Sequence, residues 1–131
     1  MADALPIAGA RHLESVALFC TTINARLYRV LQPLRVTPLQ AAILVYLYNH
    51  QAEPARVTWL AEVFHLRMPT LSEAVSTLVR RGFLKKQRSK TDGRARDLVV
   101  TTKGVMAIRQ GVERVRGLFM IRDIIENRVA S

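Results

Sequence analysis

Residues 78–104 have the sequence LVRRGFLKKQRSKTDGRARDLVVTTKG, in which a helical pattern of apolar residues gives way to an alternating one. Gly82 is predicted to end the helix as its C-cap, since glycine readily adopts the left-handed conformation of such ends. Phe83–Arg88 and Arg96–Val100 alternate as strands do, and the Asp-Gly pair in the turn at 91–93 is a strong hairpin signal. The sequence therefore predicts a helix followed directly by a basic β-hairpin.

The helix before the hairpin is predicted over Pro69–Arg81, and a shorter helix precedes it. Thr58 is expected to cap this shorter helix, after a very short strand at Val57. Two short helices joined tightly, the second with a polar outer face, form a helix-turn-helix, whose second helix enters the major groove of DNA. The residues expected to contact DNA from that face are Pro69, Thr70, Ser72, Glu73, Ser76, Thr77 and Arg80.

Further helices flank this unit. Apolar residues three and four apart predict a first helix over Ala10–Leu31, and Thr37-Pro38-Leu39-Gln40 is a capping box that begins the next helix. A last helix is predicted over residues 102–128. The predicted fold class is mainly α with a small β-hairpin (α+β): a single domain, residues 1–131, with a winged helix-turn-helix core at 37–100.

Basic residues are concentrated in one segment. The chain of 131 residues has 20 Lys and Arg against 10 Asp and Glu, a net charge of +10. Arg80–Arg96 holds eight of these cations and one acid, Asp92, and so contributes +7 of the +10. A solvated loop is the ordinary explanation of a charge run, but uniform solubilising charge would not cluster so tightly. We therefore expect the partner to be a polyanion.

A basic hairpin after a helix-turn-helix is a wing. Its tip can reach the minor groove, where the negative potential favours inserted arginine. Arg94 is the best-placed residue for this insertion, and Arg88, Lys90 and Arg96 are candidate phosphate or groove contacts. Asp92 can pair with the Arg94 side chain and hold its orientation, or it can serve simply as the turn former, and the two roles are compatible.

The motifs occur in the order and spacing of the MarR (multiple-antibiotic-resistance repressor) family. The resemblance is carried by Thr37-Pro38-Leu39-Gln40, the Leu60-Ala61 helix, residues 78–84 (LVRRGFL) and residues 92–104, which resemble the family's D-x-R…L-T-x-x-G wing signature. It implies a homodimeric winged-helix transcription regulator that binds a near-palindromic operator. It also implies that Pro69–Arg81 is the recognition helix, and that Asp92 and Arg94 are the family's wing aspartate and arginine.

The recognition helix departs from the usual pattern, because its outer face has no Arg or Lys before Arg80. The commonest specific contact, a bidentate Arg to guanine, is therefore absent from its front. Thr70 and Ser72 can contact bases or thymine methyl groups. Glu73 can accept from cytosine or form a capping box with Thr70. Wing and phosphate contacts are then expected to dominate affinity.

The last helix, capped by Thr101, carries an apolar seam of the kind that a partner-facing helix shows. Packing against its own domain is the alternative explanation. The final segment is shorter than is usual in the family, so the dimer is expected either to depend more on the first helix or to be arranged differently. The seam residues are Val105, Ile108, Val112, Val115 and Phe119. The residues expected in the dimer interface are Leu13, Val16, Val112, Val115 and Phe119.

Two features bear on sensing. Cys20 lies in the first helix, as does the reactive cysteine of the organic-hydroperoxide repressors of this family, but a buried inert thiol is the simpler interpretation. Trp59 and Phe64 can line an apolar cleft for a small-molecule effector, although aromatic residues are more often part of the core.

Other function classes lack their residue sets. His12, His50 and His65 do not have the spacing of a metal site, and no cofactor is expected. No Gly-rich phosphate loop, G-x-S-x-G motif or acid/base pair of carboxylates is present, so we expect that the protein is not an enzyme. A single cysteine, an N-terminus without a basic leader and no apolar run of membrane length predict a cytoplasmic protein.

The sequence therefore predicts a transcription regulator, acting as a repressor, that binds double-stranded DNA as a homodimer. The alternative is a winged-helix protein-interaction module, an adaptor or anti-regulator with weak or non-specific DNA binding, and the Arg-poor recognition helix motivates it. Non-specific nucleoid or RNA binding is disfavoured, since no aromatic stacking platform lies near the basic cluster.

Overall fold

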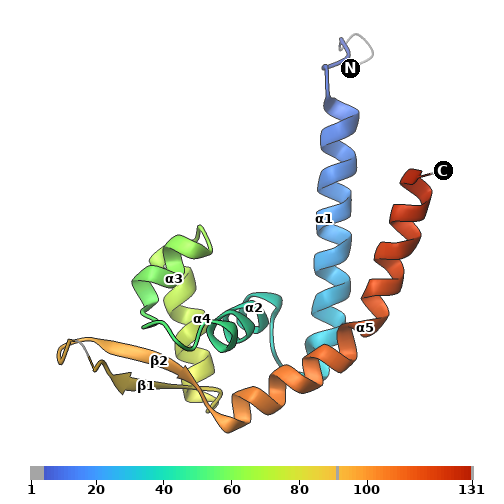
Figure 1. The fold of residues 1–131 in the computed structure, drawn as a ribbon. Helices are drawn as coiled ribbons and strands as arrows, with labels where there is room; N and C mark the ends of the chain where they lie inside the picture. Colours follow the sequence, from blue (N-terminus) through green and yellow to red (C-terminus); the bar gives the residue numbers. More distant parts are fainter. Residues whose placement is uncertain (1–4, 91, 131) are drawn as a thin grey trace.

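The computed structural model describes residues 5–90 and 92–130, with side chains for residues 5–90 and 92–117. These residues form a mainly helical fold with a two-stranded antiparallel sheet, as the sequence predicts (Figure 1). The elements are α1 (Ala10–Leu31), η1 (Gln32–Leu34), α2 (Pro38–Asn49), α3 (Val57–Val63), α4 (Met68–Arg80), β1 (Leu84–Arg88), β2 (Arg96–Val100) and α5 (Thr102–Ala130).

The elements are arranged in two parts. In Figure 1, α2, α3 and α4 pack together with the β1–β2 hairpin beside them, whereas α1 and the later part of α5 rise away from this cluster next to each other. The strands pair in register from Leu84 opposite Val100 to Arg88 opposite Arg96. The described residues contain no single helix with the length and apolar character of a membrane span; α1 with η1 and α2 reach both only as a pair bent by 76°.

Threonine caps begin two of the helices, as predicted. Thr37 begins α2 with a complete capping box: its hydroxyl accepts the Gln40 amide, and the Gln40 side chain accepts the Thr37 amide, both at 3.1 Å. Thr101 precedes α5 and accepts the Gly104 amide at 3.1 Å. These helix starts are encoded within four residues each, which is why the sequence alone identifies them.

Gly82 ends α4 in the manner that its position predicts. It has a left-handed φ of 82°, and its amide donates to the Val79 carbonyl at 3.0 Å. The next amide, of Phe83, donates to the Leu78 carbonyl at 2.9 Å, which completes a Schellman motif. The chain therefore leaves the helix at a fixed angle and enters β1 directly.

The start of α3 differs from the prediction. Val57 is the first residue of the helix rather than a strand, and Arg56, not Thr58, is its N-cap. The additional backbone pairing falls on Ala55, whose carbonyl accepts the Leu98 amide of β2 at 2.8 Å. Because the bond to the hairpin is made two residues before Val57, that residue is free to begin the helix.

Helix α4 also begins earlier than predicted. Its N-cap is Arg67, which makes no side-chain cap, and Met68 is its first residue. Thr70 therefore lies within the first turn, and the capping box of Thr70 with Glu73, considered above, does not form. Pro69 is tolerated in this turn because the first amides of a helix have no intrahelical acceptor.

The core joins one face of each central helix to the base of the hairpin. Its buried residues include Ile43, Leu44, Leu47, Leu60, Leu71, Ala74, Val75, Leu78, Phe83, Leu84 and Leu98. The apolar residues of α4 that repeat at helical spacing, Leu71, Ala74, Val75 and Leu78, are thus all buried. Helix α1 is different: from Ala10 to Thr22 every residue is exposed, including Leu13 at 69% and Leu18 at 59%.

The beginning of α5 is fastened to the end of α4. The Thr101 amide donates to the Phe83 carbonyl at 3.1 Å, and the Thr101 hydroxyl donates to the Gly82 carbonyl. Gly104 lies directly against the same Phe83 carbonyl. A Cβ at Gly104 would be 2.3 Å from the Phe83 oxygen and 2.8 Å from Val100 Cγ1, so only glycine permits this approach.

We expect Gly104→Ala to lower the free energy of unfolding by about 1–3 kcal/mol, the usual cost of forcing an extra methyl group into a packed site. The control is Gly111→Ala in the same helix, where the new Cβ would meet only the Leu31 and Leu34 side chains at 3.8 and 3.9 Å. That change should be neutral or stabilising by up to about 1 kcal/mol. Urea unfolding followed by circular dichroism measures both; equal stability of the two variants would contradict the close contact.

Candidate nucleic-acid interface

The outer face of α4 is polar and accessible. Pro69, Thr70, Glu73, Ser76 and Arg80 are exposed, and Ser72 and Thr77 are half-buried. In the described part of the chain, Glu73 has no ion-pair partner, whereas Arg80 reaches back along the helix to the Thr77 hydroxyl at 3.4 Å. The face thus offers hydroxyl groups and one unneutralised carboxylate, with its single cation at the C-terminal end.

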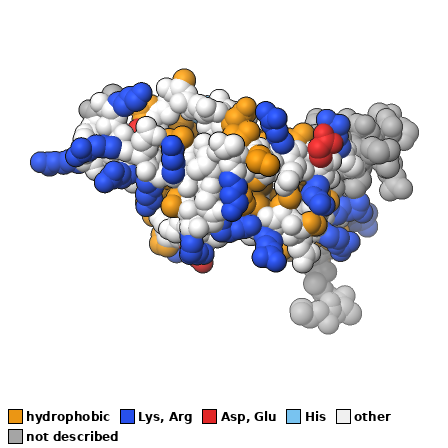
Figure 2. Space-filling view, turned by 90° about the horizontal axis from the view of Figure 1, so that it is seen from below, with side chains coloured by type: hydrophobic (Ala, Val, Ile, Leu, Met, Phe, Trp, Pro, Cys, Tyr) orange, Lys and Arg blue, Asp and Glu red, His pale blue; other side chains and the backbone are white. Residues whose placement is uncertain are grey.

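The hairpin presents the densest positive charge. Its exposed cations are Lys85, Lys86, Arg88, Lys90, Arg94 and Arg96. Figure 2 shows Lys and Arg side chains spread over the lower face of the molecule and projecting at the end where the hairpin lies, with few acidic side chains among them. Arg88 and Arg96 lie directly opposite each other across the two strands, where like charges destabilise a sheet. A bound polyanion would relieve that repulsion.

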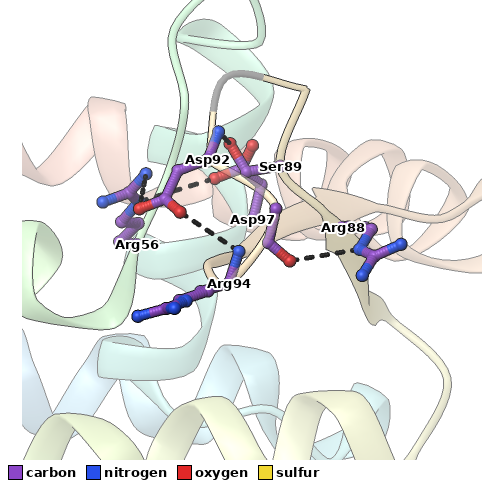
Figure 3. A network of polar contacts seen from close by, with 7 residues as sticks. Arg56, Arg88, Ser89, Asp92, Arg94 and Asp97 are labelled. Atoms are coloured by element: carbon purple, nitrogen blue, oxygen red, sulfur yellow. Dashed lines mark hydrogen bonds and ion pairs between the residues drawn. The ribbon is translucent and has the colours of Figure 1, made fainter.

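The wing loop is closed by its own hydrogen bonds. The Arg94 amide donates to Asp92 Oδ1, and Arg88 Nε donates to the Gly93 carbonyl, both at 3.1 Å (Figure 3). Two backbone bonds complete the loop: the Ala95 amide donates to the Asp92 carbonyl at 3.0 Å, and the Ser89 amide donates to the Ala95 carbonyl at 3.1 Å. Asp92 therefore acts as the turn former, one of its two predicted roles.

In the structure, the carboxylate of Asp92 pairs with an arginine other than the predicted Arg94. Asp92 holds the Arg94 backbone amide, while the Arg94 guanidinium points away from the carboxylate (Figure 3). The ion pair of Asp92 runs instead to Arg56, whose Nη2 lies 3.9 Å from Asp92 Oδ2. The Arg94 side chain is exposed and so remains available to a ligand.

Arg56 is a residue that sequence reasoning did not single out. It immediately precedes α3, and its Nε also lies 3.9 Å from Oδ1 of Asp97 in β2. No local pattern joins it to either acid, because both are far along the chain. The one available signal is the presence of two carboxylates, Asp92 and Asp97, in an otherwise basic segment, which implies a cation from elsewhere.

Arg80 and Arg81 are adjacent but differ in their surroundings. The Arg81 guanidinium donates to the Arg35 carbonyl and to the Leu34 carbonyl, the latter at 3.1 Å. It also lies 4.7 Å from the centre of the Phe83 ring. Arg81 therefore fastens α4 to the end of η1, while Arg80 faces solvent.

The residues predicted for a dimer interface lie on α1 and α5. Leu13, Val16 and Val112 are exposed, at 69%, 48% and 47%, and Val115 is half-buried. The side chain of Phe119 lies outside the described residues. Cys20 is exposed on the same helix as Leu13, rather than buried as the simpler interpretation of this thiol assumed.

An apolar cavity of about 120 Å³ lies where α1, η1, α2 and α5 meet. Its lining includes Leu27, Leu31, Leu44, Ile108, Val112 and Val115. Trp59 and Phe64 do not line it; they pack around Tyr46 against the core, with ring centres 5.6 and 5.7 Å from the Tyr46 ring. Among the described residues, no three His, Cys, Asp or Glu side chains gather in a way that could hold a metal ion.

The winged helix-turn-helix matches a known family. Residues 36–95 match the sequence model of the MarR family, which confirms the resemblance seen in the motifs. No curated protein sequence matches the chain.

Solved structures share the fold over most of the chain. The Staphylococcus aureus MepR–DNA complex is 18% identical with a TM-score of 0.71, and the match covers 95% of this chain and 82% of that one. The YusO protein of Bacillus subtilis is 22% identical with a TM-score of 0.66, covering 85% and 76%. The transcriptional regulator Tm0710 of Thermotoga maritima is 26% identical with a TM-score of 0.63, covering 89% and 80%. The fold is therefore that of winged-helix transcription regulators.

We expect Arg81→Ala to lower the free energy of unfolding by about 1–2 kcal/mol, because it removes charge-assisted bonds to two carbonyls and a cation–π contact. The matched control is Arg80→Ala, one residue earlier and exposed. It should change the free energy of unfolding, measured by thermal unfolding, by no more than about 0.5 kcal/mol. Equal destabilisation by the two changes would contradict the distinct roles given to these arginines.

Proposed function

Because the chain carries a MarR-family winged helix-turn-helix, we propose that it is a transcription regulator that binds double-stranded DNA as a homodimer in the cytoplasm. The observation that carries this proposal is the row of exposed cations on the hairpin, next to the exposed polar face of α4. A near-palindromic operator matches the two-fold symmetry of such a dimer. Occupying a promoter in this way would exclude polymerase, so we propose a repressor.

The two DNA-contacting elements have different tasks in this proposal. Lys and Arg of the wing neutralise phosphates and release counterions, which supplies affinity without sequence preference. Arg94 enters the minor groove, where the potential is most negative. In the major groove, α4 contributes the hydroxyls of Thr70 and Ser72, and Glu73 can accept from the exocyclic amine of cytosine. Discrimination between sequences rests on these few groups, so it is smaller than an arginine-bearing recognition helix provides.

The exposed apolar surface of α1 supports the dimer. Leu13 and Val16 are predicted interface residues, and Leu18 and Phe19 on the same helix are also exposed; clusters of exposed apolar residues mark surfaces that another chain covers. The cavity beside Leu27 and Ile108 lies between the α1–α5 pair and α2. A small apolar effector bound there would therefore favour one orientation of the α1–α5 pair relative to the winged helix-turn-helix.

A second candidate function is a winged-helix protein-interaction module, an adaptor or anti-regulator whose basic wing binds an acidic protein. The observation that favours it is the outer face of α4, where Glu73 is not neutralised and no cation lies between the N-cap Arg67 and Arg80. The two functions differ in salt dependence, because binding to duplex DNA releases counterions and a protein interface has a shallower dependence with fixed stoichiometry.

We expect Arg94→Ala to weaken binding to a duplex of about 30 bp from the chain's own upstream region by about 1–3 kcal/mol, the usual worth of a specific DNA contact. Fluorescence anisotropy at several salt concentrations measures this, with a scrambled duplex for comparison. Preference of at least ~1,000-fold for the native duplex supports a sequence-specific regulator. Arg11→Ala, on exposed α1, is the control for lost charge and should have little effect. Absence of wild-type binding at physiological salt would favour the interaction module.

We expect the double substitution Leu13→Glu and Val16→Glu to convert a dimer, twice the 14.8 kDa of one chain, into monomers, since four carboxylates would be buried in the interface. Light scattering after size exclusion measures the mass. Ser15→Glu, on the same turn of α1 but off the apolar stripe, should remain dimeric. A wild-type mass of one chain at micromolar concentration would refute the dimer.

A further inference from the structure

The wing is connected to the helix-turn-helix through one arginine. Arg56, immediately before α3, lies between Asp92 of the wing loop and Asp97 of β2, with a distance of 3.9 Å to each carboxylate (Figure 3). In the described residues, these are the ion pairs that join the hairpin to the rest of the molecule. The adjacent Ala55 carbonyl accepts the Leu98 amide, so backbone and side chain contact the hairpin at the same place.

The contact between Arg56 and Asp97 is partly dehydrated. Arg56 Nε and Asp97 Oδ1 are both buried, and neither has a hydrogen-bond partner. The two atoms lie 3.9 Å apart, and both are shielded from bulk solvent. Asp97, whose side chain is 20% exposed, therefore depends on Arg56 for compensation of its charge, and removing Arg56 would leave this carboxylate largely buried and unpaired.

The charges explain why two acids are tolerated in a basic surface. Asp92 and Asp97 would repel DNA phosphates, and Arg56 offsets that repulsion from the side of the helix-turn-helix. Asp92 uses its other oxygen, Oδ1, to accept the Arg94 amide at 3.1 Å. A continuous series of contacts thus runs from Arg56 through Asp92 to the backbone of Arg94.

We propose that Arg56 is the positioning residue of the wing, fixing where Arg94 stands relative to α4. This inference rests on the proposed function, because simultaneous contact with the minor and major grooves requires the wing tip and α4 to keep a set separation. Arg56 itself need not touch DNA. Its side chain is 41% exposed, and its cationic group is directed to the two carboxylates.

The free protein provides the first test, by hydrogen exchange of the Arg94 and Ala95 amides, both of which donate to Asp92. We expect Arg56→Gln to speed their exchange by about three- to tenfold, as loss of a partly buried ion pair implies. Lys90→Gln removes an exposed wing cation that has no ion pair in the described residues, and it should leave this exchange unchanged.

DNA affinity provides the second test, and its sign separates positioning from simple charge. Asp97→Asn deletes a carboxylate that repels phosphates, so charge alone predicts tighter binding. Loss of the ion pair with Arg56 instead predicts binding weaker by about three- to tenfold. Arg56→Gln should weaken binding similarly, and adding Arg94→Ala to it should cost less than Arg94→Ala costs alone. At the base pairs whose minor groove Arg94 would enter, the preference for A·T over G·C should fall with Arg56→Gln. Arg11→Gln controls for net charge.

The two tests fail separately. Unchanged exchange of the wing amides in Arg56→Gln overturns this inference, whatever the DNA result. Tighter binding by Asp97→Asn, or fully additive losses for Arg56→Gln and Arg94→Ala, also overturns it. Wild-type protein that binds no duplex overturns the proposed function instead, and the exchange experiment still reports whether Arg56 holds the wing.

Discussion

The close approach of Gly104 to the carbonyl of Phe83 is the constraint on which the geometry of this molecule depends. At this point the end of α4, the base of the hairpin and the start of α5 meet within a few residues. Gly82 turns the chain out of α4, and Thr101 returns it to the same turn by bonding to the Phe83 and Gly82 carbonyls. The base of the wing and the start of α5 are therefore held against the end of α4 by contacts close in the chain, whereas the wing tip contacts the helix-turn-helix through Arg56.

Features encoded within a few neighbouring residues could be predicted from the sequence. The capping box of Thr37 with Gln40, the C-cap at Gly82 and the turn at Asp92 are local, and each forms as expected. The buried stripe of α4 follows from helical periodicity. The predicted starts of α3 and α4 were wrong because their N-caps, Arg56 and Arg67, make no side-chain cap and so leave no recognisable signal in the sequence.

Contacts between distant segments were beyond sequence reasoning. The charge run marked the wing, but it did not indicate that Asp92 pairs with Arg56 or that Arg81 bonds to carbonyls near η1. Periodicity likewise marked an apolar stripe on α1, but it could not indicate whether another element covers that stripe. The prediction that Cys20 is buried was therefore wrong, and its thiol is exposed. For the candidate interface, the sequence therefore located the cations and hydroxyls, while the structure distinguished those that face solvent from those that hold the fold together.

The position of α1 has a consequence for the order of folding during synthesis. Its C-terminal part packs on α5, and residues 10–22 are exposed along their whole length. A ribosome makes α1 well before α5, so the first helix to emerge waits for most of the chain to follow before its neighbour exists. The segment from Thr37 to Gly104 encloses its own core and can fold in the meantime. The winged helix is thus expected to be complete before α1 packs on α5, which makes the pairing of these two helices the last step in the folding of the chain.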